Sequence, residues 1–352
     1  MQKIFRIFVA ISGIWLFGCG RRDTVPELED LFPPSAEMQA RTRMMGALEG
    51  NASDGEYFVA SCGRFVVGSN RTDPAITIFD TMTFRSVGVI RKGKGPNEVV
   101  YIGSLHENDG DLYVYNTPAK QVLTVPVVAE KLAPSFARQV VDVDYMEMLP
   151  IAGRRHVGSG SSASDDLQFY LLDSMGKRVE AIDDYVPDPE GRTIASYDNA
   201  FGQQGPLLRS PDGRHFMYAS RDGLVLKFFR ADDDHVRKIR EYIVQAPLFT
   251  PMSDPEARFY TVAVDPNNMQ GVESLTADDR YYYLLFSERL LSDEVSEADQ
   301  LLVFDHAGEP VARIRLDRPV NRIAADSRSG KLYALIQESE QNRVAEILLP
   351  EL

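Results

Sequence analysis

The chain has very little cysteine and no long apolar span. Its 352 residues contain only Cys19 and Cys62. Because Cys19 lies in the leader described below, Cys62 remains alone, so no intramolecular disulfide can form and stability must come from a hydrophobic core. We expect Cys62 to be a small buried hydrophobe. The longest apolar run, about Ile4 to Phe17, is shorter than the roughly 20 residues of a membrane-spanning helix.

The usual sequence signatures of catalysis and metal binding are also missing. The chain has no G-x-S-x-G, no H-E-x-x-H and no C-x-x-C, and its histidines are scattered: His106, His156, His215, His235 and His306. The formal net charge is −14, and losing Lys3 and Arg6 with the leader would make it −16. Such a surface repels nucleic acid and anionic lipid. We therefore predict no nucleic-acid partner, and an enzyme is not the favoured interpretation.

The N-terminus has the pattern of a secretory leader. Lys3 and Arg6 lie at the start of the apolar run, which stops at Gly18 and Cys19. The stretch Leu16-Phe-Gly-Cys19 resembles the lipobox of bacterial lipoproteins, which implies a signal peptide over 1–18 and a lipidated Cys19. An ordinary signal peptide or anchor helix is the alternative. Residues 19–50 are rich in charge and proline and predict a tether, with the chain held in the cell envelope by its lipid.

Most of the remaining sequence is a recurring β unit. Each copy contains short strands rich in Val, Ile, Tyr and Phe between polar turns. We count six copies, at 63–90, 110–127, 145–182, 210–244, 276–316 and 321–352. In the third and fifth copies a strand ends in Asp (Asp173, Asp305), and a Gly (Gly176, Gly308) opens the return strand. This D-x-x-G pattern predicts a hairpin, since Asp bonds the turn backbone and Gly accepts a positive φ.

The repeat predicts an all-β, six-bladed β-propeller over 51–352, in which each blade covers the apolar face of the next. A pair of β-sandwiches is the alternative architecture. To close the ring an N-terminal strand must complete the last blade, and we expect 57–61 to do so.

One motif makes the architecture resemble a known family. Gly93-Lys-Gly-Pro-Asn-Glu98 follows the first copy and resembles the G-x-G-P-G-E stretch of six-bladed, TolB-like β-propeller lipoproteins of Gram-negative bacteria, with Asn97 in place of the usual Gly. The resemblance implies a fold and an envelope location, on either face of the outer membrane. It implies no single activity.

The same region nearly matches a phosphate-binding loop. Gly88-Val-Ile-Arg-Lys-Gly-Lys-Gly95 has Gly95 where the pattern needs a Ser or Thr to bind Mg²⁺, and no helix follows. We therefore predict no nucleotide and interpret the segment as a crossover between blades. Its charged side chains are candidate partner contacts on an acidic protein: Arg91, Lys92, Lys94 and Glu98.

Two long connections, 183–206 and 246–276, are the other candidate binding segments, because long irregular loops often carry function. They contain the candidates Arg192, Tyr197, Asn199, Arg258 and Tyr260. The oxygen-rich runs 232–234 and 265–268 lack the spacing of a calcium loop, so we predict no metal site and no cofactor from them. A divalent metal bound in the central channel remains open.

Three tripeptides also resemble an O-glycosylation acceptor of some such bacteria: Asp23-Thr-Val25, Asp80-Thr-Met82 and Asp173-Ser-Met175. Together these features predict a membrane-anchored binding or scaffold module for an envelope protein, peptide or glycan. The alternative is a metal-dependent, lactonase-like hydrolase or lyase that uses the central channel.

Overall fold

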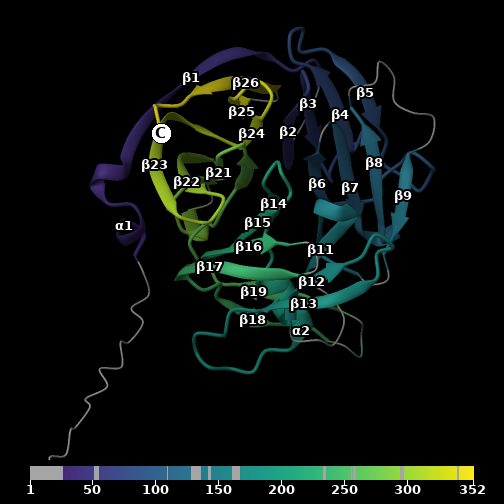
Figure 1. The fold of residues 1–352 in the computed structure, drawn as a ribbon, viewed down its shortest axis with the longest axis vertical. Helices are drawn as coiled ribbons and strands as arrows, with labels where there is room; N and C mark the ends of the chain where they lie inside the picture. Colours follow the sequence, from purple (N-terminus) through teal and green to yellow (C-terminus); the bar gives the residue numbers. More distant parts are fainter. Residues whose placement is uncertain are drawn as a thin grey trace, which may run out of the picture.

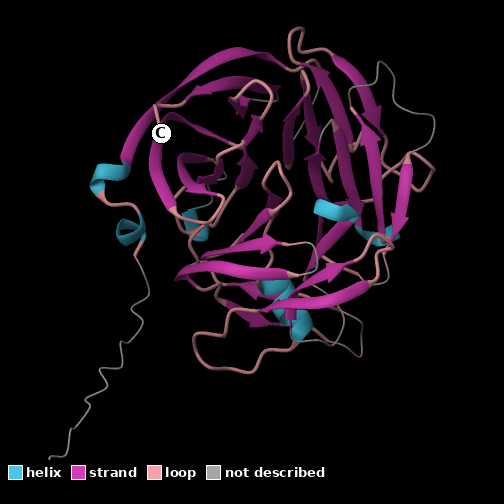
Figure 2. Cartoon of the chain, viewed as in Figure 1, coloured by secondary structure: helices cyan, strands magenta, loops and turns pink. Residues whose placement is uncertain are grey.

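The computed structural model describes most of the chain beyond the leader. The described residues are 27–50, 55–108, 110–127, 136–141, 144–160, 167–232, 235–254, 256, 259–293, 297–338 and 341–352. They are almost entirely β structure, arranged as sheets around a central axis (Figures 1 and 2). No helix among them is both long and apolar enough to cross a membrane.

Four antiparallel sheets of four strands follow one another along the chain. In each sheet the strands lie in sequence order, with the first strand beside the axis. The first sheet is β2 (Tyr57–Ser61), β3 (Arg64–Gly68), β4 (Ile76–Asp80) and β5 (Ser86–Ile90); the second is β6 (Ile102–Asn108), β7 (Asp111–Asn116), β8 (Gln121–Pro126) and β9 (Ala137–Val140); the third is β10 (Glu147–Ile151), β11 (Arg155–Ser159), β12 (Leu167–Leu172) and β13 (Arg178–Asp184); the fourth is β14 (Leu207–Arg209), β15 (His215–Ala219), β16 (Leu224–Ala231) and β17 (Val236–Gln245).

The C-terminal part forms a larger sheet of eight strands, in the order β20-β21-β22-β23-β1-β26-β25-β24. Its strands are β20 (Ser274–Ala277), β21 (Tyr281–Phe286), β22 (Ala298–Asp305), β23 (Pro310–Val320), β24 (Arg322–Asp326), β25 (Lys331–Glu338), β26 (Gln341–Leu348) and β1 (Glu37–Ala47). A two-stranded hairpin, β18 (Phe249–Pro251) and β19 (Val262–Val264), precedes it, and the longer helices are α1 (Leu28–Leu31) and α2 (Ser196–Gly202). The result is a β-propeller fold rather than a pair of sandwiches.

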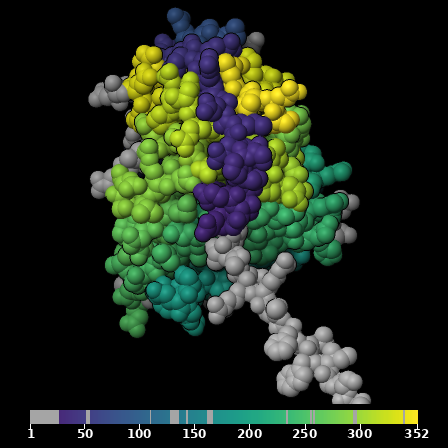
Figure 3. Space-filling view, turned by 90° about the vertical axis from the view of Figure 1, so that its left-hand side faces the viewer, coloured from purple at the N-terminus to yellow at the C-terminus, as the bar shows by residue number. Residues whose placement is uncertain are grey.

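The N-terminal strand joins the two ends of the chain. β1 pairs in parallel with β23 through residues 37–40 and antiparallel with β26 through residues 41–47. Figure 3 shows this segment, in purple, lying between C-terminal strands in yellow and yellow-green. Two expectations are corrected here. Residues 37–47 belong to the sheet and not to a tether, and 57–61 is the innermost strand of the first sheet instead of the closing strand.

The hydrophobic core is divided among the spaces between successive sheets. One cluster joins Val66 and Ile78 of the first sheet to Val114 and Leu123 of the second, and equivalent clusters follow around the ring. The middle strands are apolar along nearly their whole length because neighbouring sheets cover both of their faces. Lys227 in β16 is a buried charged exception, and its ammonium group lies 2.9 Å from the Asp183 carboxylate.

The predicted D-x-x-G hairpins are confirmed. The Gly176 N–H donates to the Asp173 carbonyl at 3.0 Å, and Gly308 and Asp305 form the same bond at the same distance. Both glycines have positive φ, 78° and 83°, a backbone conformation that other residues adopt only with strain. These turns reverse the chain between β12 and β13 and between β22 and β23.

Candidate functional site: the central channel

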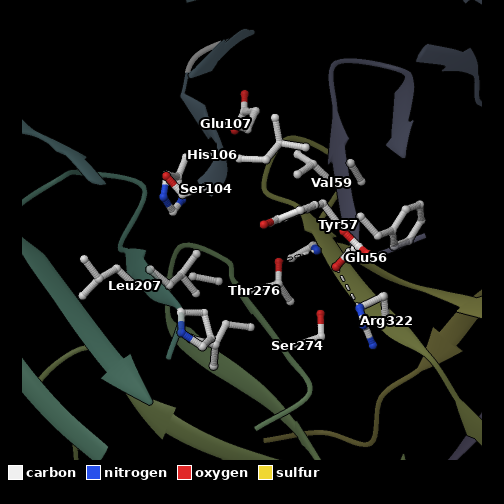
Figure 4. Close-up of a pocket in the computed structure, with 18 of the residues that line it drawn as sticks. Glu56, Tyr57, Val59, Ser104, His106, Glu107, Leu207, Ser274, Thr276 and Arg322 are labelled. Carbon is white, nitrogen blue, oxygen red and sulfur yellow. Dashed lines mark hydrogen bonds between the residues drawn. The ribbon is translucent and has the colours of Figure 1, made fainter. Parts of the chain in front are cut away.

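The first strands of the successive sheet units surround an open channel. β2, β6, β10, β14, β20 and β24 contact one another in this order, and β24 contacts β2 again. They enclose a cavity of about 710 Å³, which falls within the range of small-ligand pockets, roughly 300–1,000 Å³. Figure 4 shows side chains from several of these strands converging on it.

Small hydroxyl side chains hold neighbouring inner strands together. Ser104 of β6 donates to the Met148 carbonyl of β10 at 2.7 Å and accepts the Met148 N–H at 3.2 Å. Ser274 of β20 makes the same pair of bonds with Ile323 of β24. Each hydroxyl thus satisfies backbone groups that have no ladder partner on that side. Neighbouring inner strands are therefore linked by side chains and not by a continuous backbone ladder, which leaves the channel open between them.

Charged groups complete this set of contacts where the inner strands begin, which we call the N-terminal end of the channel. The Arg322 Nε donates to the Glu56 carbonyl at 2.9 Å, the bond drawn in Figure 4. A carboxylate oxygen of Glu147 accepts the Leu207 N–H at 3.0 Å. Both bonds link neighbouring strand units, so these side chains support the ring as well as line it.

The N-terminal end of the channel carries both signs of charge. Its lining includes three arginines and four carboxylates: Arg71, Arg221, Arg322, Glu56, Glu147, Asp222 and Glu273. The Arg71 guanidinium lies 3.3 Å from the Glu56 carboxylate, and that of Arg322 lies 3.5 Å from Glu273. The exposed ring of Tyr101 lies at the same end. This arrangement suits a polar ligand with its own charged and hydrogen-bonding groups.

Burial changes the protonation of these carboxyls. Desolvation raises the pKa of Glu147 to about 8, against the opposing effects of the Leu207 N–H and the Arg221 charge. Desolvation also raises the pKa of Asp222 and of Glu273, with Arg221 opposing the shift of Asp222 and Arg322 that of Glu273. A carboxyl in such a site is a hydrogen-bond donor when protonated and an acceptor when ionised.

The opposite end of the channel is different in character. His106 lines it, and burial followed by the Arg209 charge lowers the pKa of His106 to about 3, so its imidazole is neutral near pH 7. The Ser61 hydroxyl donates to the Glu107 carboxylate at 2.6 Å. Cys62 is a half-exposed free thiol and not the fully buried side chain we expected. Nowhere in the described residues do three or more His, Cys, Asp or Glu side chains form a group that could hold a metal.

The predicted basic crossover lies between β5 and β6, outside the channel lining. The Arg91 guanidinium is 3.6 Å from the Asp73 carboxylate, and the Lys92 ammonium donates to the Asn70 carbonyl. The Glu98 carboxylate accepts the Gly95 N–H at 2.7 Å. A Cβ on Gly93 would fall 2.1 Å from a Glu98 carboxylate oxygen, so Gly93 leaves room for this carboxylate to reach the Gly95 N–H.

This segment therefore functions as the crossover that the sequence predicts. Lys94 is exposed. Contact of Arg91, Lys92, Lys94 or Glu98 with a partner stays a prediction.

The two long connections contact each other in the structure, although from the sequence they were two separate candidate segments. The Tyr197 and Tyr260 rings lie 5.4 Å apart between centroids. The Arg192 guanidinium pairs with Asp188 at 2.6 Å and donates to the Phe249 carbonyl at 3.1 Å. Asn199 bonds within its own helix region, to the Ile194 carbonyl. Arg192 and Asn199 thus hold the connections in place, and Tyr260 remains partly exposed.

Several predicted features lie outside the described residues: Cys19, Arg258 and Asp23-Thr-Val25. The other two glycosylation-like tripeptides occupy exposed hairpin turns, where Met82 is 85% and Met175 is 77% exposed. Their modification stays a prediction.

Sequence reasoning missed the channel residues Arg221, Arg322, Glu147 and Glu273. Three of these directly precede or begin an inner strand, and Arg221 belongs to an Arg-Asp-Gly turn. A charged residue at the start of successive copies was the available signal. The copies do not share it in identical form, so it does not stand out in one sequence.

Comparisons with known proteins support the fold alone. No protein-family model and no curated protein matches the chain. Among solved structures, a putative exported protein of Bacteroides fragilis aligns with a TM-score of 0.54 at 9% identity, covering 90% of this chain and 99% of that one.

Two further structures align less well. A member of the duf4221 family from Bacteroides vulgatus gives a TM-score of 0.49 at 9% identity, covering 89% of this chain and 99% of that one. The β-propeller domain of Myceliophteria thermophila Cps50 (Swd1) gives 0.46 at 11% identity, covering 87% and 100%.

Proposed function

We propose that this chain is a membrane-anchored envelope lipoprotein whose β-propeller binds a protein, peptide or glycan in its central channel. One observation carries the proposal. The channel is a cavity of about 710 Å³ whose N-terminal end is lined by arginines, carboxylates and an exposed tyrosine. Concave sites with a few convergent polar groups are the usual form of ligand sites.

The envelope location is supported by the leader pattern and by the description of the Bacteroides fragilis structure as an exported protein. Six blades are part of the same proposal. The eight-stranded sheet divides into β20–β23 and β24–β26 with β1, joined at the parallel β23–β1 contact. Counted in this way, it adds two four-stranded blades to the four separate sheets. Membership of the TolB-like group rests on the Gly93–Glu98 motif.

The metal-dependent hydrolase or lyase is not favoured by a specific observation. Such an enzyme needs several ligands around one point in the channel. Three of the four carboxylates at the N-terminal end, those of Glu56, Glu147 and Glu273, instead bond to a backbone N–H group or an arginine. Binding is the function that these contacts support best.

A channel-filling substitution tests the proposal. Val59 of β2 lines the channel, so Val59→Trp should obstruct it, whereas Val87→Trp on the exposed outer strand β5 is the matched control. Short peptides and oligosaccharides are screened by thermal unfolding of the full chain in detergent, because a ligand of the native state raises Tm. We expect ligands that stabilise wild type and Val87→Trp but not Val59→Trp. Ligands that stabilise all three proteins equally would contradict a channel site.

A further inference from the structure

Arg221 lies on a turn that other segments hold rigidly. The turn joins β15 to β16 at the N-terminal end of the channel. The Arg221 N–H donates to the Gln204 carbonyl at 2.8 Å, and the Arg221 carbonyl accepts the Gly271 N–H at 2.9 Å. A Cβ on Gly205 would lie 1.9 Å from the Ala219 carbonyl oxygen. Only glycine permits this approach, so the sequence of the crossover is adapted to hold the turn that presents Arg221.

The Arg221 side chain has a weak neutral partner. Its guanidinium donates to the Gln204 side-chain oxygen at 3.4 Å. Within the described residues no carboxylate lies within ion-pair distance of it. Its charge nevertheless opposes the raised pKa values of Glu147, Asp222 and Glu273. Arg221 is therefore close to three carboxyls without being neutralised by direct contact with any of them.

The other cations at this end already have acidic partners. Arg71 pairs with Glu56 at 3.3 Å and Arg322 with Glu273 at 3.5 Å. The Glu147 carboxylate is held by the Leu207 N–H. Arg221 differs in being an exposed guanidinium with no carboxylate partner among the described residues. An anion that enters the channel mouth can therefore bind it in the two-pronged geometry that arginine offers a carboxylate.

We propose that Arg221 binds the C-terminal carboxylate of a short peptide that enters the channel from this end. The inference rests on the proposed binding function and names its ligand. An acidic glycan brings repeated negative charges, which a chain of net charge −14 would repel. A peptide end brings one carboxylate followed by amide N–H groups, which the neighbouring carboxyl oxygens accept.

The test compares two tetrapeptide pools of identical random sequence, one with free C-termini and one amidated. Each pool is incubated with the full chain in detergent micelles, and retained peptides are measured by mass spectrometry. We expect the free-acid pool to be retained about 10- to 100-fold better, the range of a hydrogen bond to a charged group. Arg221→Gln should remove this preference, and Arg221→Lys should keep part of it.

Arg328→Gln is the matched control, because Arg328 is an exposed arginine that lines the opposite end of the same channel. It should leave the preference within about twofold of wild type. Equal retention of acid and amide pools by wild type overturns the inference without any variant. An oligogalacturonate, which is an acidic glycan, is tested in the same way. If the chain retains it through Arg221 and does not retain the free-acid peptides, the peptide assignment is overturned.

Failure of this inference is distinguishable from failure of the proposed function. In one outcome the thermal screen finds a ligand that no longer raises the Tm of Val59→Trp, while the peptide pools show no preference for free C-termini. That result leaves the channel function intact and removes the role of Arg221. Retention of neither peptides nor screened ligands removes both.

Discussion

At the scale of single residues, the channel gathers side chains whose charge is costly to bury. Glu147 is the clearest case, since desolvation raises its pKa from 4.5 to about 8 while its carboxylate holds the Leu207 N–H. A native pKa above the unfolded value means that the folded state binds more protons between these two pH values. The free energy of unfolding therefore falls as pH rises from about 4.5 to about 8.

Glu147→Gln should remove this pH dependence and retain an oxygen that accepts the Leu207 N–H. We expect the variant to be more stable than wild type at pH 8 by more than about 1 kcal/mol, since one pKa unit is worth about 1.4 kcal/mol, and to match it near pH 4.5. Urea unfolding at several pH values measures the difference. Glu256→Gln, at an exposed glutamate, should change nothing. A constant difference between Glu147→Gln and wild type at all pH values would contradict the assignment.

At the scale of elements, β1 is the part that local pattern could not predict. Its sequence, EMQARTRMMGA, has one fully buried residue, Ala40, because the strand lies at the outer rim. Its partners β23 and β26 lie roughly 270 to 310 positions later in the chain. No periodicity within the segment encodes such pairing. By contrast, the hairpins at Gly176 and Gly308 were predictable because Asp and Gly determine each turn within four residues.

Removing the N-terminal segment should therefore destabilise the whole ring. A chain beginning at residue 51 loses β1 and also Leu28 and Phe32, which are buried beneath the Phe304 region. We expect it to lose cooperative urea unfolding and to regain it when a peptide of residues 27–47 is added. A chain from residue 51 that unfolds like wild type would show that β1 is dispensable.

Phe32→Ala alone should lower the free energy of unfolding by about 3–5 kcal/mol.

At the scale of the whole molecule, the sequence predicted the all-β fold and its repeated units well but the site poorly. The first four copies fall within the four four-stranded sheets and the last two within the eight-stranded sheet, because strands and turns are specified within about 50 residues. The channel is different, since Arg221, Arg322 and Glu147 come from three separate units. They meet only when the ring closes, and single-sequence reasoning therefore favoured the long loops. Those loops do meet, through Tyr197 and Tyr260, but neither of these two tyrosines lines the channel.

The position of the fold's first residues also constrains how the proposed lipid anchor holds the molecule. Glu27 directly precedes α1, and Phe32 just beyond that helix packs at the rim against Phe304. From Cys19 to Glu27 is eight residues, a reach of at most about 29 Å, so the rim should stay close to the membrane. Cys19→Ser should move the protein from the membrane pellet to the supernatant on ultracentrifugation, whereas Cys62→Ser, at the only other cysteine, should stay in the pellet. A Cys19→Ser protein that still pellets would show that the chain reaches the membrane by a route other than acylation.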